Sequence, residues 1–367
     1  MCVYSSKMHC DGTIDMEKEK VVAEFFKHGH LLTEEALKLL DHVDDTDWNL
    51  PLVVDAGDIQ KPYRIIKNIT SKKTELKSDD FVKFFNSKYE KMKAIITSRI
   101  NKDFISLNKI GNTRGEVYTI GIVRDIKDKD GKKIVEIEDT TASIPVIFDS
   151  VDVELDDVIA VQAIEGGKVL FGKKILYPDI PLRKPTAGRG KGCFVSDLCL
   201  DESPRADAEK FFQWFGRSDV QYLFVAGRIG DLDQLEKYVE QYCYIKTVFL
   251  VSEEKMPGLP IKVKNSRIVS LSNPAMVDVG GLKILMAQRA DATMLKKRHL
   301  GKSDVITEED YMALDEIPDV VHSGNSAEPY ITNYKSVTLV NSGSLLGTFR
   351  PVVIDFSTRD ADLLTVT

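Results

Sequence analysis

Residues 115–149, GEVYTIGIVRDIKDKDGKKIVEIEDTTASIPVIFD, decide the fold of the middle of the chain, because their apolar residues alternate instead of following a helical period. The Asp-Gly pair in this stretch is typical of a tight hairpin turn, and a third strand is expected at 143–148. Two more strands are expected in 156–180, around a Gly-Gly pair. Five short strands in about 65 residues predict a small closed barrel over 111–180, most economically an OB-fold.

The chain before the barrel is predicted to be mainly helical. Residues 1–45 are expected to form a small helical module, in which Gly29 breaks a first helix and Thr33 caps a second. Residues 46–110 are expected to hold a linker followed by a basic amphipathic helix over 79–101. Neither segment is long enough to hold a large core of its own.

Basic residues gather in two segments. Between 61 and 102 there are 12 Lys/Arg and 4 Asp/Glu, a local net of +8, so the remainder carries −15 within a net charge of −7. This segment favours contact with nucleic acid or an acidic partner, or else a solvated helix face. The second segment, PLRKPTAGRGKG (181–192), is predicted to be a linker that serves as a flexible tether or touches phosphate backbone. The candidate nucleic-acid contacts are Lys72, Lys73, Arg183, Lys184, Arg189 and Lys191.

Composition excludes several classes of protein. The chain has 367 residues, 43% of them hydrophobic, which is enough for two or three domains with cores. No apolar run approaches the ~20 residues that span a bilayer, and the N-terminal MCVYSSKMHCDGTIDMEKEK lacks the order of a signal peptide. Five cysteines without a CxxC pair argue against a zinc ribbon and a disulfide framework. These features predict an intracellular, cytoplasmic protein with no membrane contact.

Residues 193–367 are predicted to be an α/β domain, because strands alternate there with helices. Ligands in such domains bind beyond the carboxyl ends of the strands, so the residues that follow each strand are the informative ones. The stretches that contain them are FVSDLCLDE (194–202), FVAGRIGD (224–231), VFLVSEEK (248–255), SLSNPAMV (270–277), ILMAQRAD (284–291) and VVHSGNSAE (320–328).

This succession resembles the calcineurin-like metallophosphoesterases, and most closely the small subunits of archaeal family-D DNA polymerases and the B-subunits of eukaryotic replicative polymerases. The most specific shared pieces are FVSDL (194–198), SNPA (272–275), VHSG (321–324) and NSGS (341–344). The resemblance implies an α+β multidomain protein with an N-terminal helical module, an OB-fold barrel and a phosphoesterase-like α/β sandwich.

Active members of that family hold two divalent metals, which polarise a phosphoryl group and generate a hydroxide nucleophile. The resemblance places the first metal-binding aspartate on Asp197 and its partner histidine on Cys199. The later ligands fall on residues of other types, among them Arg228, a cation without a lone pair. Asp231 takes the place of the lost aspartate if the alignment is shifted by three residues. The positions of this vestigial pocket are then Asp197, Cys199, Arg228, Asp231, Glu253, Glu254, Ala287, Asn325 and Ala327.

The resemblance therefore implies a site without metal, cofactor or catalysis. His322 precedes the position of the last histidine motif and is expected to be a strand-end residue. A guanidinium at Arg228 is expected to form an internal salt bridge with Asp197, Glu253 or Glu254 where the metals lie in active members.

Three functions stand as alternatives. The first is a non-catalytic scaffold subunit that forms a heterodimer with the large catalytic subunit of a replicative DNA polymerase and meets DNA through that complex. The second is an active metal-dependent 3′–5′ exonuclease, for which the ligand set is deficient. The third is a separate single-stranded nucleic-acid-binding protein that uses the barrel and residues 61–102, with steeply salt-dependent affinity.

Overall fold

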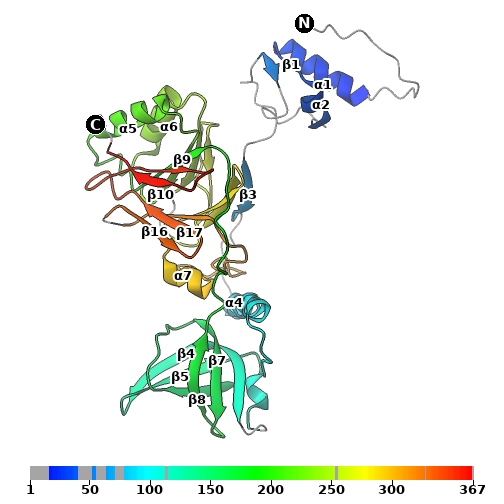
Figure 1. Cartoon of the computed structure of the whole chain (residues 1–367), viewed down its shortest axis with the longest axis vertical. Coiled ribbons are helices and arrows are strands. Elements are labelled where there is room, and N and C mark those ends of the chain that lie inside the picture. The colour runs from blue at the N-terminus through cyan, green and yellow to red at the C-terminus, as the bar shows by residue number, and fades with distance from the viewer. Residues whose placement is uncertain are drawn as a thin grey trace. The chain divides into compact units, whose positions relative to one another are not determined.

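A computed structural model describes residues 16–39, 52–54, 63–70, 78–111, 115–252, 255–326 and 328–365. The chain forms two compact units, residues 1–64 and 65–367 (Figure 1). Helices, a closed barrel and two mixed sheets make it an α+β multidomain protein, as predicted. None of the helices in these ranges is long and apolar enough to cross a membrane.

The described residues 16–39 and 52–54 of the first unit form two short helices and two short strands. The elements are α1 (Met16–Lys27), β1 (Leu31–Leu32), α2 (Glu34–Leu39) and β2 (Val53–Val54). The predicted cap is confirmed, since the hydroxyl of Thr33 accepts the N–H of Ala36 at 3.2 Å. β2 pairs in parallel with β1, and its Val54 packs in a buried apolar cluster with Val21 and Phe25 of α1. This unit therefore includes residues that the sequence analysis assigned to the linker 46–110.

The second unit contains α4 (Ser78–Arg99), which is the predicted amphipathic helix, and a 3-10 turn η1 (Leu107–Lys109). A closed five-stranded barrel follows, in the order β4-β5-β6-β8-β7, which confirms the predicted barrel. Its strands are β4 (Glu116–Lys129), β5 (Lys132–Glu138), β6 (Ser143–Phe148), β7 (Val158–Glu165) and β8 (Leu170–Leu176). The turn between β4 and β5 has positive φ at Asp130 (51°) and Gly131 (74°), as a two-residue hairpin of this handedness requires.

Two six-stranded sheets form the rest of the second unit. Their orders are β12-β11-β10-β9-β18-β19 and β16-β17-β15-β14-β13-β3. The strands of the first sheet are β9 (Lys191–Ser196), β10 (Tyr222–Ala226), β11 (Thr247–Val251), β12 (Ile268–Ser270), β18 (Val352–Asp355) and β19 (Ala361–Leu363). Those of the second are β3 (Tyr63–Lys67), β13 (Ala275–Val279), β14 (Leu282–Ala287), β15 (Val320–Ser323), β16 (Tyr330–Tyr334) and β17 (Val337–Asn341).

The two sheets pack against each other and are covered on their outer faces. α5 (Arg205–Arg217) and α6 (Leu232–Tyr242) bury apolar stripes against one face of the first sheet. α7 (Ala292–Lys297) and the segment 298–314 cover the far face of the second sheet. Between the sheets, the ring of Phe194 stacks on that of Phe224 at 4.6 Å. This arrangement agrees with the prediction of sheets covered by helices.

α4 joins the barrel to the sheets, as Figure 1 shows. Its apolar face, which includes Met92 and Ile96, packs against Ile120 and Val158 of the barrel and against Ala313. Polar contacts support the same joint: Lys91 of α4 pairs with Glu309 at 3.0 Å, and Lys297 of α7 pairs with Asp157 of the barrel at 2.8 Å. Apolar burial therefore supplies most of the contact, and the ion pairs set its orientation.

The segment 181–192 differs from its prediction as a flexible tether. The Arg183 guanidinium donates to the carboxylate of Asp319 at 2.7 Å. The N–H of Gly188 donates to the carbonyl of Phe356, and that of Arg189 to the carbonyl of Gly280. The segment is anchored because its backbone amides and its first guanidinium both find partners on the sheets. It also ends in a strand, since β9 begins at Lys191 and not at residue 193 as predicted.

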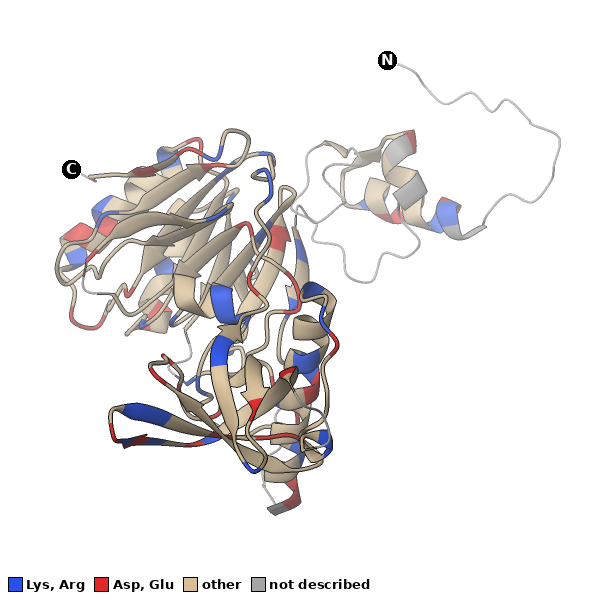
Figure 2. Ribbon diagram, turned by 60° about the horizontal axis from the view of Figure 1, so that its bottom comes forward, with Lys and Arg blue, Asp and Glu red and all other residues tan. Residues whose placement is uncertain are grey.

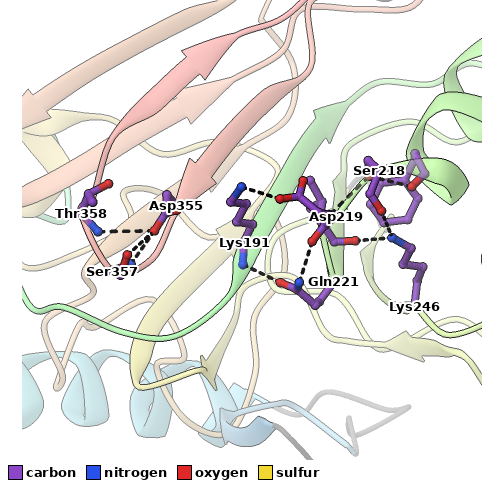
Figure 3. A network of polar contacts seen from close by, with 10 residues as sticks. Lys191, Ser218, Asp219, Gln221, Lys246, Asp355, Ser357 and Thr358 are labelled. Atoms are coloured by element: carbon purple, nitrogen blue, oxygen red, sulfur yellow. Dashed lines mark hydrogen bonds and ion pairs between the residues drawn. The ribbon is translucent and has the colours of Figure 1, made fainter.

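Lys191 itself lies in a polar network at the start of β9 (Figure 3). Its ammonium pairs with Asp219 at 2.5 Å, and its N–H donates to the side chain of Gln221 at 2.7 Å. Beside it, the ammonium of Lys246 donates to the carbonyls of Ser218 and Val220. These contacts hold the loop that leads into β10.

Asp319 is the buried anchor of the segment 181–192, and its replacement by alanine tests that anchor. The carboxylate is 2% exposed and accepts from Arg183, from the Thr186 hydroxyl at 2.7 Å and from the Lys283 N–H at 2.9 Å. Asp319→Ala leaves these donors without an acceptor, so we expect the free energy of unfolding to fall by about 2–4 kcal/mol in urea titrations.

Asp149→Ala serves as the matched control. Asp149 is 95% exposed and pairs with Lys132 at 3.5 Å, so the same assay should show an unchanged midpoint. Equal losses in the two variants would contradict the anchoring role of Asp319.

Candidate functional site

The carboxylate of Asp197 lies at the carboxyl end of β9, where the loops after β10 and β15 meet it. Its Oδ1 accepts the N–H of Arg228 at 2.9 Å, and its Oδ2 accepts the N–H of Asn325 at 2.6 Å. The residue is 9% exposed. Charge-assisted hydrogen bonds of this kind are among the stronger ones, so Asp197 ties three loops together.

Backbone strain is concentrated around this carboxylate. Asp197, Cys199 and Asn325 all adopt the left-handed region, with φ of 48°, 46° and 52°. Residues other than glycine rarely adopt this region, and such outliers persist where their surroundings overdetermine them. The site is therefore a strained meeting point of loops rather than an ordinary set of turns.

Two glycines allow the loops to approach so closely. A Cβ at Gly227, whose φ is +87°, would lie 2.2 Å from Asp197 Oδ1. A Cβ at Gly324 would lie 2.7 Å from the Cα of Gly227. Both positions need glycine because the neighbouring backbone or carboxylate occupies the space.

Of the partners expected for the Arg228 guanidinium, the structure describes Asp197, whereas Glu253 and Glu254 lie outside the described residues. The guanidinium donates to Asp201 at 2.5 Å and to Glu202 at 2.7 Å, and only the backbone N–H of Arg228 reaches Asp197. The hydrogen bond that the guanidinium donates to Glu202 is the main cause that raises the pKa of Arg228. The expected bridge to Asp197 is therefore wrong. The reason is local: the chain after Asp197 turns back along the Arg228 loop, where the Leu200 N–H donates to the Ile229 carbonyl.

The other predicted positions have structural partners or lie outside the described residues. Asp231 caps α6 by accepting the N–H of Gln234 at 3.0 Å, so it does not stand in for a lost metal ligand. The Cys199 thiol lies 3.9 Å from the Ser344 hydroxyl, and burial raises its pKa. Ala287 is buried at the end of β14. Glu253, Glu254 and Ala327 lie outside the described residues.

His322 is a strand residue in the core, as expected. It lies in β15, is fully buried, and its Nε2–H donates to the carbonyl of Val195 in the facing sheet at 3.0 Å. Its ring meets that of Phe194 edge-on at 5.4 Å. Burial lowers the pKa of His322 to about 4, so the imidazole is neutral at physiological pH.

The side chains of this site do not fit a two-metal centre. Within the part of the chain that the structure describes, no group of three or more His, Cys, Asp or Glu side chains is placed to hold a metal ion. Both oxygens of Asp197 already accept backbone N–H groups. In the next loop, Arg228 donates its backbone N–H to this carboxylate, and its guanidinium offers no lone pair to a metal. The geometry supports loop anchoring rather than metal binding.

The three described cysteines, Cys193, Cys199 and Cys243, are free and buried. Burial also raises the pKa of Cys193 and brings that of Cys243 to about 12, so these thiols are not poised as nucleophiles.

The basic residues proposed for nucleic-acid contact have different environments. Arg183 and Lys191 are engaged in ion pairs with Asp319 and Asp219, while Lys184 and Arg189 are exposed. Lys72 and Lys73 lie outside the described residues. Figure 2 shows Lys and Arg interspersed with Asp and Glu along the ribbon. Contact with nucleic acid stays a prediction for all six.

Sequence reasoning missed the residues that complete this site. The acidic pair 201–202 is visible in FVSDLCLDE, but nothing in the sequence shows that the chain turns back toward Arg228. Gly227 and Gly324 follow strand ends in the quoted stretches, and that position was the available signal for a close approach.

Comparison with known proteins finds a consistent set of relatives. The chain is 25% identical to the DNA polymerase II small subunit of Archaeoglobus fulgidus, over 77% of this chain and 73% of that protein. It is 26% identical to those of Methanothermobacter thermautotrophicus and Thermoplasma acidophilum, over 72% of this chain and 72% and 71% of theirs. No protein-family profile matches the chain.

Solved structures give weaker likenesses. Vps29 of Chaetomium thermophilum has a TM-score of 0.29 and 16% identity, covering 45% of this chain and 82% of its own. An OBody bound to hen egg-white lysozyme has a TM-score of 0.19 and 23% identity, covering 21% of this chain and 94% of its own. These scores are too low to support an inference about the fold.

Gly227→Ala tests the close approach at Asp197. The added Cβ would collide with the carboxylate at a positive φ, so we expect the free energy of unfolding to fall by about 2 kcal/mol or more. Gly347→Ala is the control, because a Cβ there meets nothing within 4 Å and its φ is ordinary. Thermal or urea unfolding of both variants gives the comparison, and equal stabilities would argue against a crowded site.

Proposed function

We propose that this chain, a homologue of the small subunits of archaeal DNA polymerase II, is a non-catalytic small subunit of a family-D replicative DNA polymerase. The observation that carries the assignment is the sequence similarity, which extends over roughly three quarters of this chain and of its relatives. In this role the chain binds the large catalytic subunit as a heterodimer, meets DNA through the complex and works in the cytoplasm at the nucleoid.

We infer a finer architecture from the strand orders. A five-stranded antiparallel barrel in which the third and fifth strands, β6 and β8, pair in parallel is an OB-fold arrangement. Two mixed six-stranded sheets packed face to face with outer helices fit a phosphoesterase-like sandwich. The loops that follow strands of both sheets meet at Asp197, which supports the proposal of a vestigial pocket there.

The absence of catalysis is inferred from the chemistry of the donor set. Phosphoester hydrolysis by two metals needs oxygen and imidazole ligands with free lone pairs. Here Asp197 accepts backbone N–H groups, Cys199 is a buried thiol, and Arg228 carries a positive charge into the loop that would supply a ligand. Bound metal would have to displace these hydrogen bonds and overcome that charge.

A scaffold role is supported by the joint at α4. The helix contributes to a buried cluster with the barrel and pairs with the segment 298–314 through Lys91 and Glu309. If the large subunit binds both the barrel and the sheets, it binds two surfaces whose relative position α4 already fixes. Less conformational freedom is then lost on association.

Co-purification with the large subunit tests the assignment. We expect the tagged chain, co-expressed with the large family-D subunit of the same organism, to elute as a 1:1 complex in size-exclusion chromatography with light scattering. The large subunit expressed with an unrelated OB-fold protein is the control. A chain that stays monomeric in the presence of the large subunit would refute the proposal.

Hydrolysis of a 3′-labelled single-stranded oligonucleotide with Mn²⁺ tests the loss of catalysis. We expect no product above the metal-free background and no Mn²⁺ binding by calorimetry, because the ligands that two metals require are missing. A relative with intact motifs is the positive control. Hydrolysis that disappears in Asp197→Asn would restore the exonuclease alternative while leaving the subunit assignment in place.

A further inference from the structure

A cavity of about 210 Å³ lies where β3, β13, α4 and residues 310–316 meet, away from Asp197. Its lining combines apolar residues with two lysines, Lys67 and Lys91. The volume accommodates several water molecules or a small organic group. None of these residues belongs to the site described above.

Lys67 lines this cavity and is half-buried, and the main partner of its ammonium group is a carbonyl rather than a carboxylate. Its Nζ donates to the carbonyl of Ala313 at 2.8 Å, and no carboxylate of the described residues lies within ion-pair distance. Lys91, on the other wall, donates to Glu309 at 3.0 Å and to the carbonyl of Asp310 at 2.8 Å. The two lysines of the cavity therefore differ: Lys91 is paired and Lys67 is not.

The carboxylates that face Lys67 are mostly committed elsewhere. Asp310 binds His299 through Oδ2 and the Met312 N–H through Oδ1. Glu316 pairs with Lys283. Asp315 is exposed at the rim of the cavity. Burial lowers the pKa of Lys67 to about 8; the charges of Asp315 and Asp310 oppose this, and that of Lys91 adds to it.

We propose that Lys67 is an acyl-acceptor site, whose amine takes an acyl group from an activated donor such as an anhydride, a thioester or an acyl phosphate. The lone pair of Nζ forms a bond to the carbonyl carbon, and the leaving group departs with the electrons of the bond that breaks. The proton of the amine goes to water. The amide that results is uncharged, keeps one N–H to donate, and places its acyl group in the cavity. This site does not depend on the polymerase assignment.

The expected gain in reactivity follows from the population of neutral amine. At pH 7.5 an amine with a pKa of about 8 is about 24% neutral, against about 0.1% at the ordinary value of 10.5. Weaker bases are weaker nucleophiles. A Brønsted slope of about 0.4–0.5, as for thiolates, lowers the rate constant of the neutral amine by about 10- to 20-fold. The net gain is about tenfold over an ordinary lysine amine.

Competitive labelling of the full chain with trace acetic anhydride tests the proposal. Mass spectrometry compares the acetylation of Lys67 with that of Lys184, an exposed lysine in the segment 181–192, between pH 6.5 and 10. We expect Lys67 to react about tenfold faster at pH 7.5, and its rate to level off above about pH 9. A rate at or below that of Lys184 at every pH overturns the proposal, whether the amine is charged or the reagent cannot enter.

Two variants sharpen the assignment. Lys67→Arg keeps a cation and a donor for the Ala313 carbonyl, so it should fold normally and lose the fast-labelled peptide. Asp315→Asn removes an exposed carboxylate that favours the charged amine, so it should raise the labelling rate of Lys67 at pH 7.5. An unchanged or lower rate in Asp315→Asn counts against the proposal.

Discussion

The carboxylate of Asp197 accepts backbone N–H groups from the loops after β10 and β15, and the strand ends of both sheets are arranged around these two bonds. A buried carboxylate is costly unless its oxygens are satisfied, so the neighbouring loops must come close. That requirement explains the glycines at 227 and 324 and the left-handed backbone at Asp197 and Asn325. The residue that the family resemblance marks as a metal ligand is, in this chain, the centre of a hydrogen-bonded loop junction.

Several basic side chains elsewhere in the second unit are also buried or half-buried rather than exposed. Three lysines of the basic segment 61–102 serve the joint between α4 and its neighbours: Lys67 and Lys91 line a cavity, and Lys88 is 6% exposed. Arg183 of the second basic segment is held by a buried aspartate. Part of the local excess of positive charge in the sequence therefore lies on side chains that are buried or half-buried within this unit, among which Lys91 and Arg183 form ion pairs.

Prediction from the sequence succeeded where local pattern and structure coincide. The alternating residues of 115–149 gave the barrel, and the bounds of α5, α6, β10, β11 and β17 agree with the amphipathic and apolar runs that mark them. β13 and β16 were missed, although they have five residues each, as do β10, β11 and β17. The segment 181–192 was predicted to be a tether because it is rich in proline, glycine and charge. The distant carbonyl groups that accept its backbone N–H groups cannot be recognised from its composition.

The sequence by itself determined the order of helices, barrel and sheets and the similarity to the polymerase small subunits. Only the tertiary structure decided which groups meet: that Arg228 turns to Asp201 and Glu202, that Asp231 caps a helix, and that Lys67 faces a cavity. The physical reason is the distance along the sequence between the residues that interact. Periodicity and composition report interactions between residues a few positions apart, whereas the partner of a carboxylate or an amine is set by chain crossings tens to hundreds of residues away.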